Sequence, residues 1–112
     1  MRILILEDEP IIAFDLEDIV SSNLDAECLL ASNLDEGLEL IDSGIDFALL
    51  DVSLGDSGET SLPIAAQLIQ RRIPFCFVSA SLGSLPASYR HVPQVSKPFR
   101  PNEVTRVLPL AA

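Results

Sequence analysis

The residues whose chemical types could work together as a site are Glu7, Asp8, Asp51, Ser79 and Lys97. Each lies at the end of a short, mostly apolar segment of the kind that forms a buried strand. In an open parallel sheet the carboxyl ends of the strands share one edge, and ligands bind there. We therefore expect these five side chains to surround one crevice.

Three carboxylates in one crevice need a positive partner, because at about 4 Å and an effective dielectric near 20 each pair costs on the order of 4 kcal/mol. A hard divalent cation suits such a cluster, and Mg²⁺ is the usual choice where phosphate also binds. The cation and Lys97 would neutralise an incoming phosphoryl group, and the Ser79 hydroxyl could donate to one of its oxygens. Asp51 could attack phosphorus to form an acyl phosphate, since phosphoryl transfer needs mainly positioning and charge stabilisation.

Five segments with strand signals would position these residues. The central segment, 46–51, is apolar without polar alternation and ends on Asp51, which favours a strand buried on both faces. Helix signals separate the five segments, and no stretch pairs two strands through a hairpin turn. The pattern predicts an α/β fold: a doubly wound, five-stranded parallel sheet with helices on both faces. The predicted strands are Arg2–Leu6, Glu27–Ala31, 46–51, Ile73–Ser79 and Gln94–Ser96.

The helices between these strands are predicted from capping residues and apolar spacing. The region 80–93 holds one glycine and two prolines, so it can form at most a short helix between Leu85 and His91. Of the other predicted helices, the first runs from Pro10 to 21–23, and the second from a Ser32 or Asn33 cap to 43–44. The third begins at a Ser61 cap and has Pro63 in its first turn. The fourth begins at Pro101, carries Val104, Val107 and Leu108, and is stopped by Pro109.

Length and composition predict one domain over residues 1–112. The net charge of −10 argues against direct binding of nucleic acid or an anionic membrane, and fits a basic protein partner or a cation site. Cys28 and Cys76 lie far apart in apolar runs, so they are predicted to be small buried hydrophobes. The sequence has no signal-peptide pattern and no run long enough for a membrane span, so we expect a cytoplasmic location.

Four motifs, each weak alone, follow one another at the predicted strand ends across essentially the whole chain. They are Leu6-Glu7-Asp8-Glu9-Pro10, Leu49-Leu50-Asp51-Val52, Val78-Ser79-Ala80 and Ser96-Lys97-Pro98-Phe99. With these motifs the chain resembles a receiver domain of response regulators, in the CheY-like superfamily. A narrower resemblance is to stand-alone alphaproteobacterial receivers that carry Phe-Ala-Thr-Gly-Tyr after the fourth strand, where this chain has Phe77-Val78-Ser79-Ala80-Ser81.

The resemblance implies the flavodoxin-like strand order 2-1-3-4-5 and a phosphoryl group accepted on Asp51 from a histidine kinase or a histidine phosphotransfer protein. It implies that Glu7, Asp8, Asp51 and the backbone carbonyl of Ser53 hold Mg²⁺. Ser79 then matches the switch hydroxyl and Lys97 the phosphate-pairing lysine, with a cis Lys97–Pro98 bond. Such a protein signals by binding a downstream protein partner and is not a turnover enzyme.

One departure from the family concerns Gln94, which stands where receivers usually have an aromatic ring three residues before the lysine. This departure keeps open an interaction module that signals without phosphate. A metal-dependent phosphatase is a further alternative, although Ser53 stands where such enzymes usually have a second acid. A flavin-binding module is disfavoured, because residues 7–9 would repel a phosphate. Glu9 and His91 are predicted to be surface residues, and Ser81 could tune water access to the phosphoryl group.

Overall fold

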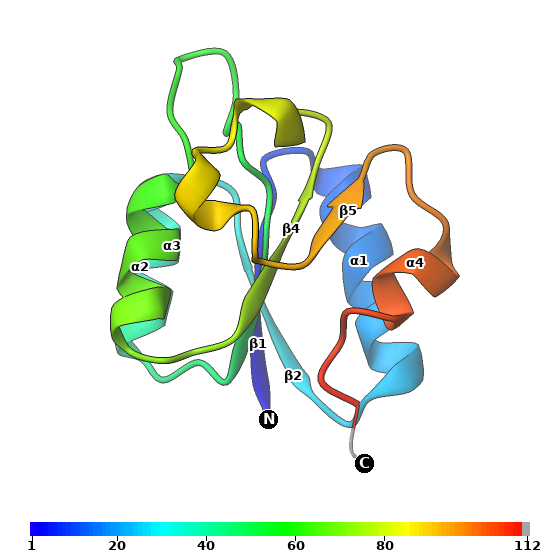
Figure 1. The fold of residues 1–112 in the computed structure, drawn as a ribbon. Helices are drawn as coiled ribbons and strands as arrows, with labels where there is room; N and C mark the ends of the chain where they lie inside the picture. Colours follow the sequence, from blue (N-terminus) through cyan, green and yellow to red (C-terminus); the bar gives the residue numbers. More distant parts are fainter. Residues whose placement is uncertain (111–112) are drawn as a thin grey trace.

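A computed structural model describes residues 1–110 and contains one five-stranded sheet (Figure 1). All neighbouring strands pair in parallel, and their order is β2-β1-β3-β4-β5, so the predicted fold class and strand order are confirmed. The strands are β1 (Arg2–Leu6), β2 (Glu27–Ala31), β3 (Phe47–Leu50), β4 (Phe75–Ser79) and β5 (Gln94–Ser96).

Helices cover both faces of the sheet (Figure 1). Helices α1 and α4 pack together on one face, and α2 and α3 pack together on the other. Two single 3₁₀ turns occupy the connection between β4 and β5, where the sequence allowed at most a short helix. The helices are α1 (Pro10–Asn23), α2 (Leu34–Asp42), α3 (Leu62–Gln70) and α4 (Pro101–Thr105), and the 3₁₀ turns are η1 (Leu82–Ser84) and η2 (Ala87–Tyr89).

Element boundaries and one predicted helix cap differ from the sequence predictions for local reasons. Strand β4 begins at Phe75 because Pro74 has no N–H to add to the ladder. Helix α4 ends at Thr105, since the following N–H groups of Val107 and Leu108 bond three residues back in tighter turns. Ser61 occupies the position before α3, but its buried hydroxyl makes no capping hydrogen bond. Asn33 does cap α2, because its side chain accepts the Glu36 N–H.

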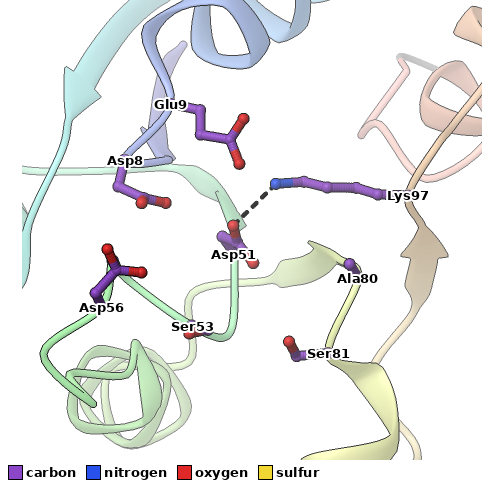
Figure 2. Close-up of a pocket in the computed structure, with 9 residues that line it drawn as sticks. Asp8, Glu9, Asp51, Ser53, Asp56, Ala80, Ser81 and Lys97 are labelled. Carbon is purple, nitrogen blue, oxygen red and sulfur yellow. Dashed lines mark hydrogen bonds and ion pairs between the residues drawn. The ribbon is translucent and has the colours of Figure 1, made fainter.

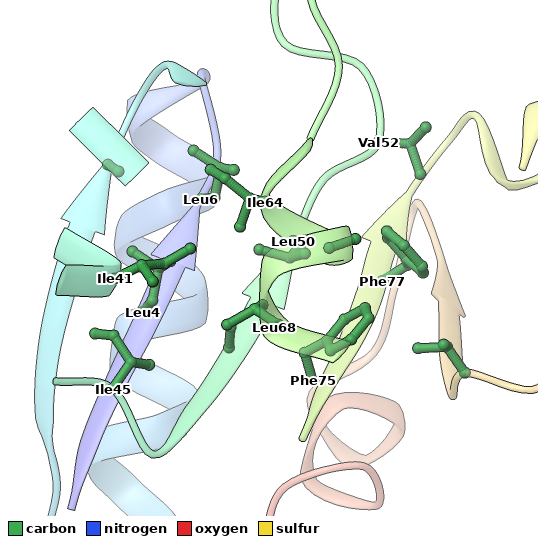
Figure 3. Close-up of a cluster of buried hydrophobic side chains, with 14 of the residues drawn as sticks. Leu4, Leu6, Ile41, Ile45, Leu50, Val52, Ile64, Leu68, Phe75 and Phe77 are labelled. Carbon is green, nitrogen blue, oxygen red and sulfur yellow. The ribbon is translucent and has the colours of Figure 1, made fainter. Parts of the chain in front are cut away.

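The core consists of one apolar cluster on each side of the sheet. All four residues of β3 are buried, as the central position of this strand requires. Cys76 is buried among the apolar residues and Cys28 is half-buried. The cluster beneath α2 and α3 contains Leu4, Leu6, Ile41, Leu50, Ile64, Leu68, Phe75 and Phe77 (Figure 3).

The close approach of α2 and α3 depends on Gly37, because a Cβ there would overlap the Cδ1 atom of fully buried Ile64. We expect Gly37→Ala to lower the free energy of unfolding by about 1–2 kcal/mol, since overpacking outweighs the gain in helix propensity. Ile64→Val removes the obstructing methyl group, so the double variant should lose less than the sum of the two single losses. Urea unfolding of all three variants tests this, and strict additivity would contradict it.

Arg72 follows α3 in the left-handed conformation, with φ of 60°. The Arg72 and Ile73 N–H groups bond to Ile69 and Leu68 carbonyls, which is the Schellman arrangement that usually places glycine here. We expect Arg72→Gly to raise the free energy of unfolding by about 0.5–1 kcal/mol. Arg90→Gly is the control at an ordinary φ of −66°, and it should lower stability. A loss of stability in both variants on urea unfolding would contradict the prediction.

Candidate functional site at the carboxyl edge of the sheet

Three carboxylates meet where β1 and β3 end. Glu7 and Asp8 follow β1 and Asp51 follows β3, and each offers an oxygen within 4.8 Å of the others. Glu7 is 2% exposed and Asp51 is 7% exposed, whereas Asp8 is half-buried. The structure therefore brings together the three acids that the sequence placed at one edge.

Backbone hydrogen bonds fix these residues by extending the sheet ladder past the strand ends. The Asp51 N–H donates to the Leu6 carbonyl at 2.9 Å, and the Glu7 N–H donates to the Ala31 carbonyl at 2.9 Å. On the other side of the site, the Lys97 N–H donates to the Ser79 carbonyl at 3.1 Å. Since these bonds belong to neighbouring parallel strands, the side chains project from a rigid frame.

Lys97 reaches across the edge to two of the acids, and Figure 2 shows its contact with Asp51. Its Nζ donates to Asp51 Oδ2 at 2.9 Å and also to Glu7 Oε1. The Lys97 side chain is 12% exposed, and the peptide bond to Pro98 is cis, as the resemblance predicts. A lysine that follows β5 is thus placed over the carboxylate that follows β3.

The pKa values of Glu7 and Lys97 reflect this shared burial. Burial raises the pKa of Glu7 to about 7, although hydrogen bonds from Lys97 Nζ and from the Glu9 N–H oppose the shift. Burial also acts to lower the pKa of Lys97, but the hydrogen bonds and charges of Glu7 and Asp51 outweigh it, and the pKa rises. A cation bound beside Glu7 would favour its ionised form.

Ser79 ends β4 at the same edge, but its hydroxyl has a local partner. The Ser79 Oγ accepts the Ser81 N–H at 3.0 Å, and Ser79 is 1% exposed. Ala80 and Ser81, rather than Ser79, line the cavity above Asp51. To donate to a phosphoryl oxygen, the Ser79 hydroxyl would have to become accessible from this buried position.

Ser53 lies in the loop between β3 and α3, opposite Thr60 in an isolated antiparallel bridge. The two hydrogen bonds of the bridge are made by the neighbouring residues. The Leu54 N–H donates to the backbone carbonyl of Glu59, and the Ser61 N–H donates to the backbone carbonyl of Val52. The bridge therefore does not use the Ser53 carbonyl. Ser53 lines the cavity next to Asp51 (Figure 2).

The cavity above Asp51 measures about 220 Å³, enough for several water molecules or a hydrated ion. Two of its acidic residues were not predicted as site residues. Glu9 lies at its mouth, just before α1, and Asp56 reaches it from the β3–α3 loop. The one sequence signal for Asp56 is the pair Gly55 and Gly58, because glycines mark sharp turns of such a loop.

Gln94 and the aromatic residues lie apart from this cavity. Gln94 is exposed on β5, so no ring stands three residues before Lys97. Tyr89, in the second 3₁₀ turn, packs edge-on against Phe77 with ring centroids 5.9 Å apart. Phe77 in turn packs edge-on against Phe75 at 5.5 Å, so these aromatic rings belong to the core.

No family model and no curated protein sequence matches this chain. Among solved structures, SdrG from Sphingomonas melonis Fr1 is 38% identical, with a TM-score of 0.83, and the match covers 96% of this chain and 92% of SdrG. The response regulator PhyR from Brucella abortus is 34% identical, with a TM-score of 0.78, over 95% of this chain and 45% of that longer protein. The receiver domain of PhyR from Erythrobacter litoralis is 28% identical, with a TM-score of 0.80, over 95% of this chain and 84% of that one.

These similar proteins come from alphaproteobacteria, in agreement with the narrower resemblance in the sequence. Over residues 1–110, no helix is both long enough and apolar enough to cross a membrane.

Proposed function

Because the chain belongs to the receiver-domain family of response regulators, we propose that it accepts a phosphoryl group on Asp51. The phosphodonor in this proposal is a histidine kinase or a histidine phosphotransfer protein, and the output is a changed surface that binds a protein partner. The observation that carries the proposal is the contact of Lys97 Nζ with Asp51 beside two further carboxylates. Residues 1–112 would act as one receiver unit, and a histidine phosphodonor implies a cytoplasmic location.

The roles proposed for the side chains follow from their chemistry. Asp51 Oδ1 or Oδ2 attacks phosphorus as the donor departs, which forms the acyl phosphate. Lys97 is near enough to transfer its hydrogen bond from the carboxylate to a phosphoryl oxygen, where negative charge develops. The Ser79 hydroxyl would donate a hydrogen bond to the bound phosphoryl group once it no longer accepts the Ser81 N–H. The chain modifies itself in this scheme and does not turn over a substrate.

The donor set fits Mg²⁺ better than a softer metal. Glu7, Asp8 and Asp51 offer carboxylate oxygens, and the Ser53 carbonyl is outside the bridge hydrogen bonds of its loop. Hard oxygen ligands around a cavity that also admits water suit Mg²⁺. When bound, the ion supplies positive charge next to the transferring phosphoryl group. In its absence Lys97 alone offsets the acids with which it makes ion pairs.

Acetyl phosphate tests the proposal without a protein phosphodonor. With Mg²⁺ present, the intact mass of the wild type should rise by one phosphoryl group, and that of Asp51→Asn should stay unchanged. The same incubation with EDTA should give no adduct. An unmodified wild type, or equal modification of both proteins, would contradict the proposal.

An apolar ridge on α1 lies beside the site and supports a protein phosphodonor. Ile11 is 84% exposed and Phe14 is 59% exposed, whereas large apolar side chains are usually buried. Phe14 lines a groove that reaches Glu7 and Asp8 on one side of α1. A second groove, on the other side, shares Lys97 with the Asp51 cavity. A phosphodonor seated on this ridge would be in contact with both borders of the site.

We expect Phe14→Ala to slow phosphotransfer from a histidine phosphodonor protein by about 10- to 30-fold, because a buried aromatic contact can dominate an interface. Phosphorylation by acetyl phosphate should stay unchanged, since that donor needs no docking surface. Ile69→Ala on α3 is the matched control, as Ile69 is 47% exposed and lines neither groove. A parallel loss with both donors would contradict docking at the ridge.

A receiver-like module that signals without phosphate is the second candidate. Gln94 in place of the usual ring, and two 3₁₀ turns in place of a helix between β4 and β5, favour it. Once a protein partner has been captured, equal affinity for wild type and Asp51→Ala, with or without phosphorylation, would support this candidate. A clear increase in affinity on phosphorylation of the wild type alone would exclude it.

A further inference from the structure

We infer that Asp56 is a positioning residue that strengthens binding of a divalent cation through the water molecules of the ion. This inference rests on the proposed function, because it concerns the same cation. Asp56 comes from the loop between β3 and α3, and its carboxylate lines the cavity together with Asp8 and Asp51 (Figure 2).

The loop has a fixed base. The Ser53–Thr60 bridge joins its two arms, and the Glu59 carboxylate accepts the Leu34 N–H at 2.9 Å, where α2 begins. Both anchors lie before or after the tip of the loop and do not involve the tip itself. Asp56 is therefore held at the end of a loop that is tied to β3 on one side and to α2 on the other.

The tip of the loop is turned toward Asp8. Gly55 and Gly58 both have positive φ, 83° and 82°, and they bracket Asp56 and Ser57. A Cβ on Gly55 would lie 3.8 Å from Asp8 Oδ2, so the backbone next to Asp56 already borders the acidic cluster. Figure 2 shows the carboxylates of Asp8 and Asp56 on the same side of the cavity.

Charge compensation in the cavity is incomplete. Lys97 is its one basic lining residue, and Lys97 makes ion pairs with Glu7 and Asp51. Asp8 and Asp56 have no ion-pair partner among residues 1–110. Two acids on one wall without a basic partner favour a cation between them and Asp51.

Asp56 lies outside the set of acids close enough to share one ion directly, which within residues 1–110 contains Glu7, Asp8 and Asp51. Mg²⁺ keeps several of its waters in such sites, and a carboxylate on the cavity wall can accept hydrogen bonds from them. Carboxylates that hydrogen-bond to the ligands of a buried metal ion raise the affinity for the metal about 10- to 100-fold, whereas exposed ion pairs contribute only a few-fold. Asp56 is exposed, so we expect an intermediate contribution of about three- to tenfold.

The same charge should have the opposite effect on the phosphodonor. Acetyl phosphate is an anion, and Asp56 lines the cavity in which it would meet Asp51. Removing this negative charge should raise the rate of phosphorylation about two- to threefold once the cation site is saturated. The two effects of Asp56→Asn thus have opposite signs, which a general loosening of the loop would not produce.

Calorimetric titration with MgCl₂ tests the first effect on the wild type, Asp56→Asn and Asp18→Asn. Asp18 is an exposed acid on α1 that does not line the cavity, so its variant changes the net charge equally. We expect about three- to tenfold weaker Mg²⁺ binding for Asp56→Asn and less than about 1.5-fold for Asp18→Asn. Equal affinities of the two variants would overturn the inference alone. A wild type that binds no Mg²⁺ would overturn both the inference and the proposed metal site.

Phosphorylation by acetyl phosphate tests the second effect at two Mg²⁺ concentrations. Below saturation Asp56→Asn should be phosphorylated more slowly than the wild type, and at saturation more rapidly, so the two rate curves should cross. Slower phosphorylation at every Mg²⁺ concentration, or no difference at any, would overturn the inference. Thermal unfolding of Asp56→Asn should match the wild type in EDTA, which confirms that the variant is folded.

Discussion

Lys97→Met should lower the free energy of unfolding by about 3 kcal/mol, because it leaves two buried carboxylates without their cation. The Lys97 Nζ makes ion pairs with Glu7, whose side chain is 1% exposed, and with Asp51, whose side chain is 8% exposed. Methionine keeps most of the apolar stem, so the change removes chiefly the charge. Urea unfolding in EDTA measures the loss free of bound metal. This expected loss of stability lies at the low end of the range for broken buried ion pairs, since the Lys97 side chain is 12% exposed.

Glu7→Gln in the Lys97→Met background is the control for this explanation. It removes one uncompensated carboxylate, so the double variant should recover at least about 1 kcal/mol of the loss. The pKa of Glu7 is raised from 4.5 to about 7, so its contribution to stability is complete below pH 4.5 and is lost as the pH rises through 7. The deficit of Lys97→Met should accordingly be larger at pH 8 than at pH 6. A pH-independent loss that Glu7→Gln leaves unchanged would contradict the explanation.

Asp8→Asn should have opposite effects on stability and on phosphorylation. In EDTA the variant should be more stable than the wild type by about 1 kcal/mol, because it relieves repulsion within the Glu7–Asp8–Asp51 cluster in a half-exposed setting. In Mg²⁺ at ten times the dissociation constant, the wild type should gain about 1.4 kcal/mol, and Asp8→Asn should gain nothing measurable. Phosphorylation by acetyl phosphate should be slowed about 100-fold or more, since the amide holds the cation poorly.

The matched control for Asp8→Asn is again Asp18→Asn, which lowers the negative charge by the same amount outside the cavity. It should leave both Mg²⁺ binding and phosphorylation close to those of the wild type. Thermal unfolding in EDTA and in MgCl₂, together with rates of phosphorylation, measures all three proteins. Equal Mg²⁺ stabilisation of the wild type and Asp8→Asn would contradict the account of the acidic cluster.

The sequence predicted the frame of the site because the frame depends on strand ends. Short apolar runs mark the strands, and parallel strands present their carboxyl ends at one edge whatever their exact register. Glu7, Asp8, Asp51 and Lys97 therefore follow directly from the pattern, and the structure brings them together at that edge.

The remaining details depend on tertiary hydrogen bonds that leave no periodic signal. The position of Asp56 is set by the Ser53–Thr60 bridge and by Glu59 at the start of α2. The orientation of the Ser79 hydroxyl is set by the Ser81 N–H at the beginning of a 3₁₀ turn. Propensity and spacing describe segments one at a time, so neither contact could be read from them.

Trapping of the phosphorylated residue tests the central claim most directly. After incubation with acetyl phosphate and MgCl₂, borohydride reduces an aspartyl phosphate to homoserine, and peptide mass spectrometry locates the new residue. Phosphorylation at Asp51 predicts homoserine at position 51 of the wild type and at no position of Asp51→Asn. Homoserine at Asp8 or Asp56, or no homoserine in a wild type that has gained a phosphoryl group, would contradict the assignment of Asp51 as the phosphoacceptor.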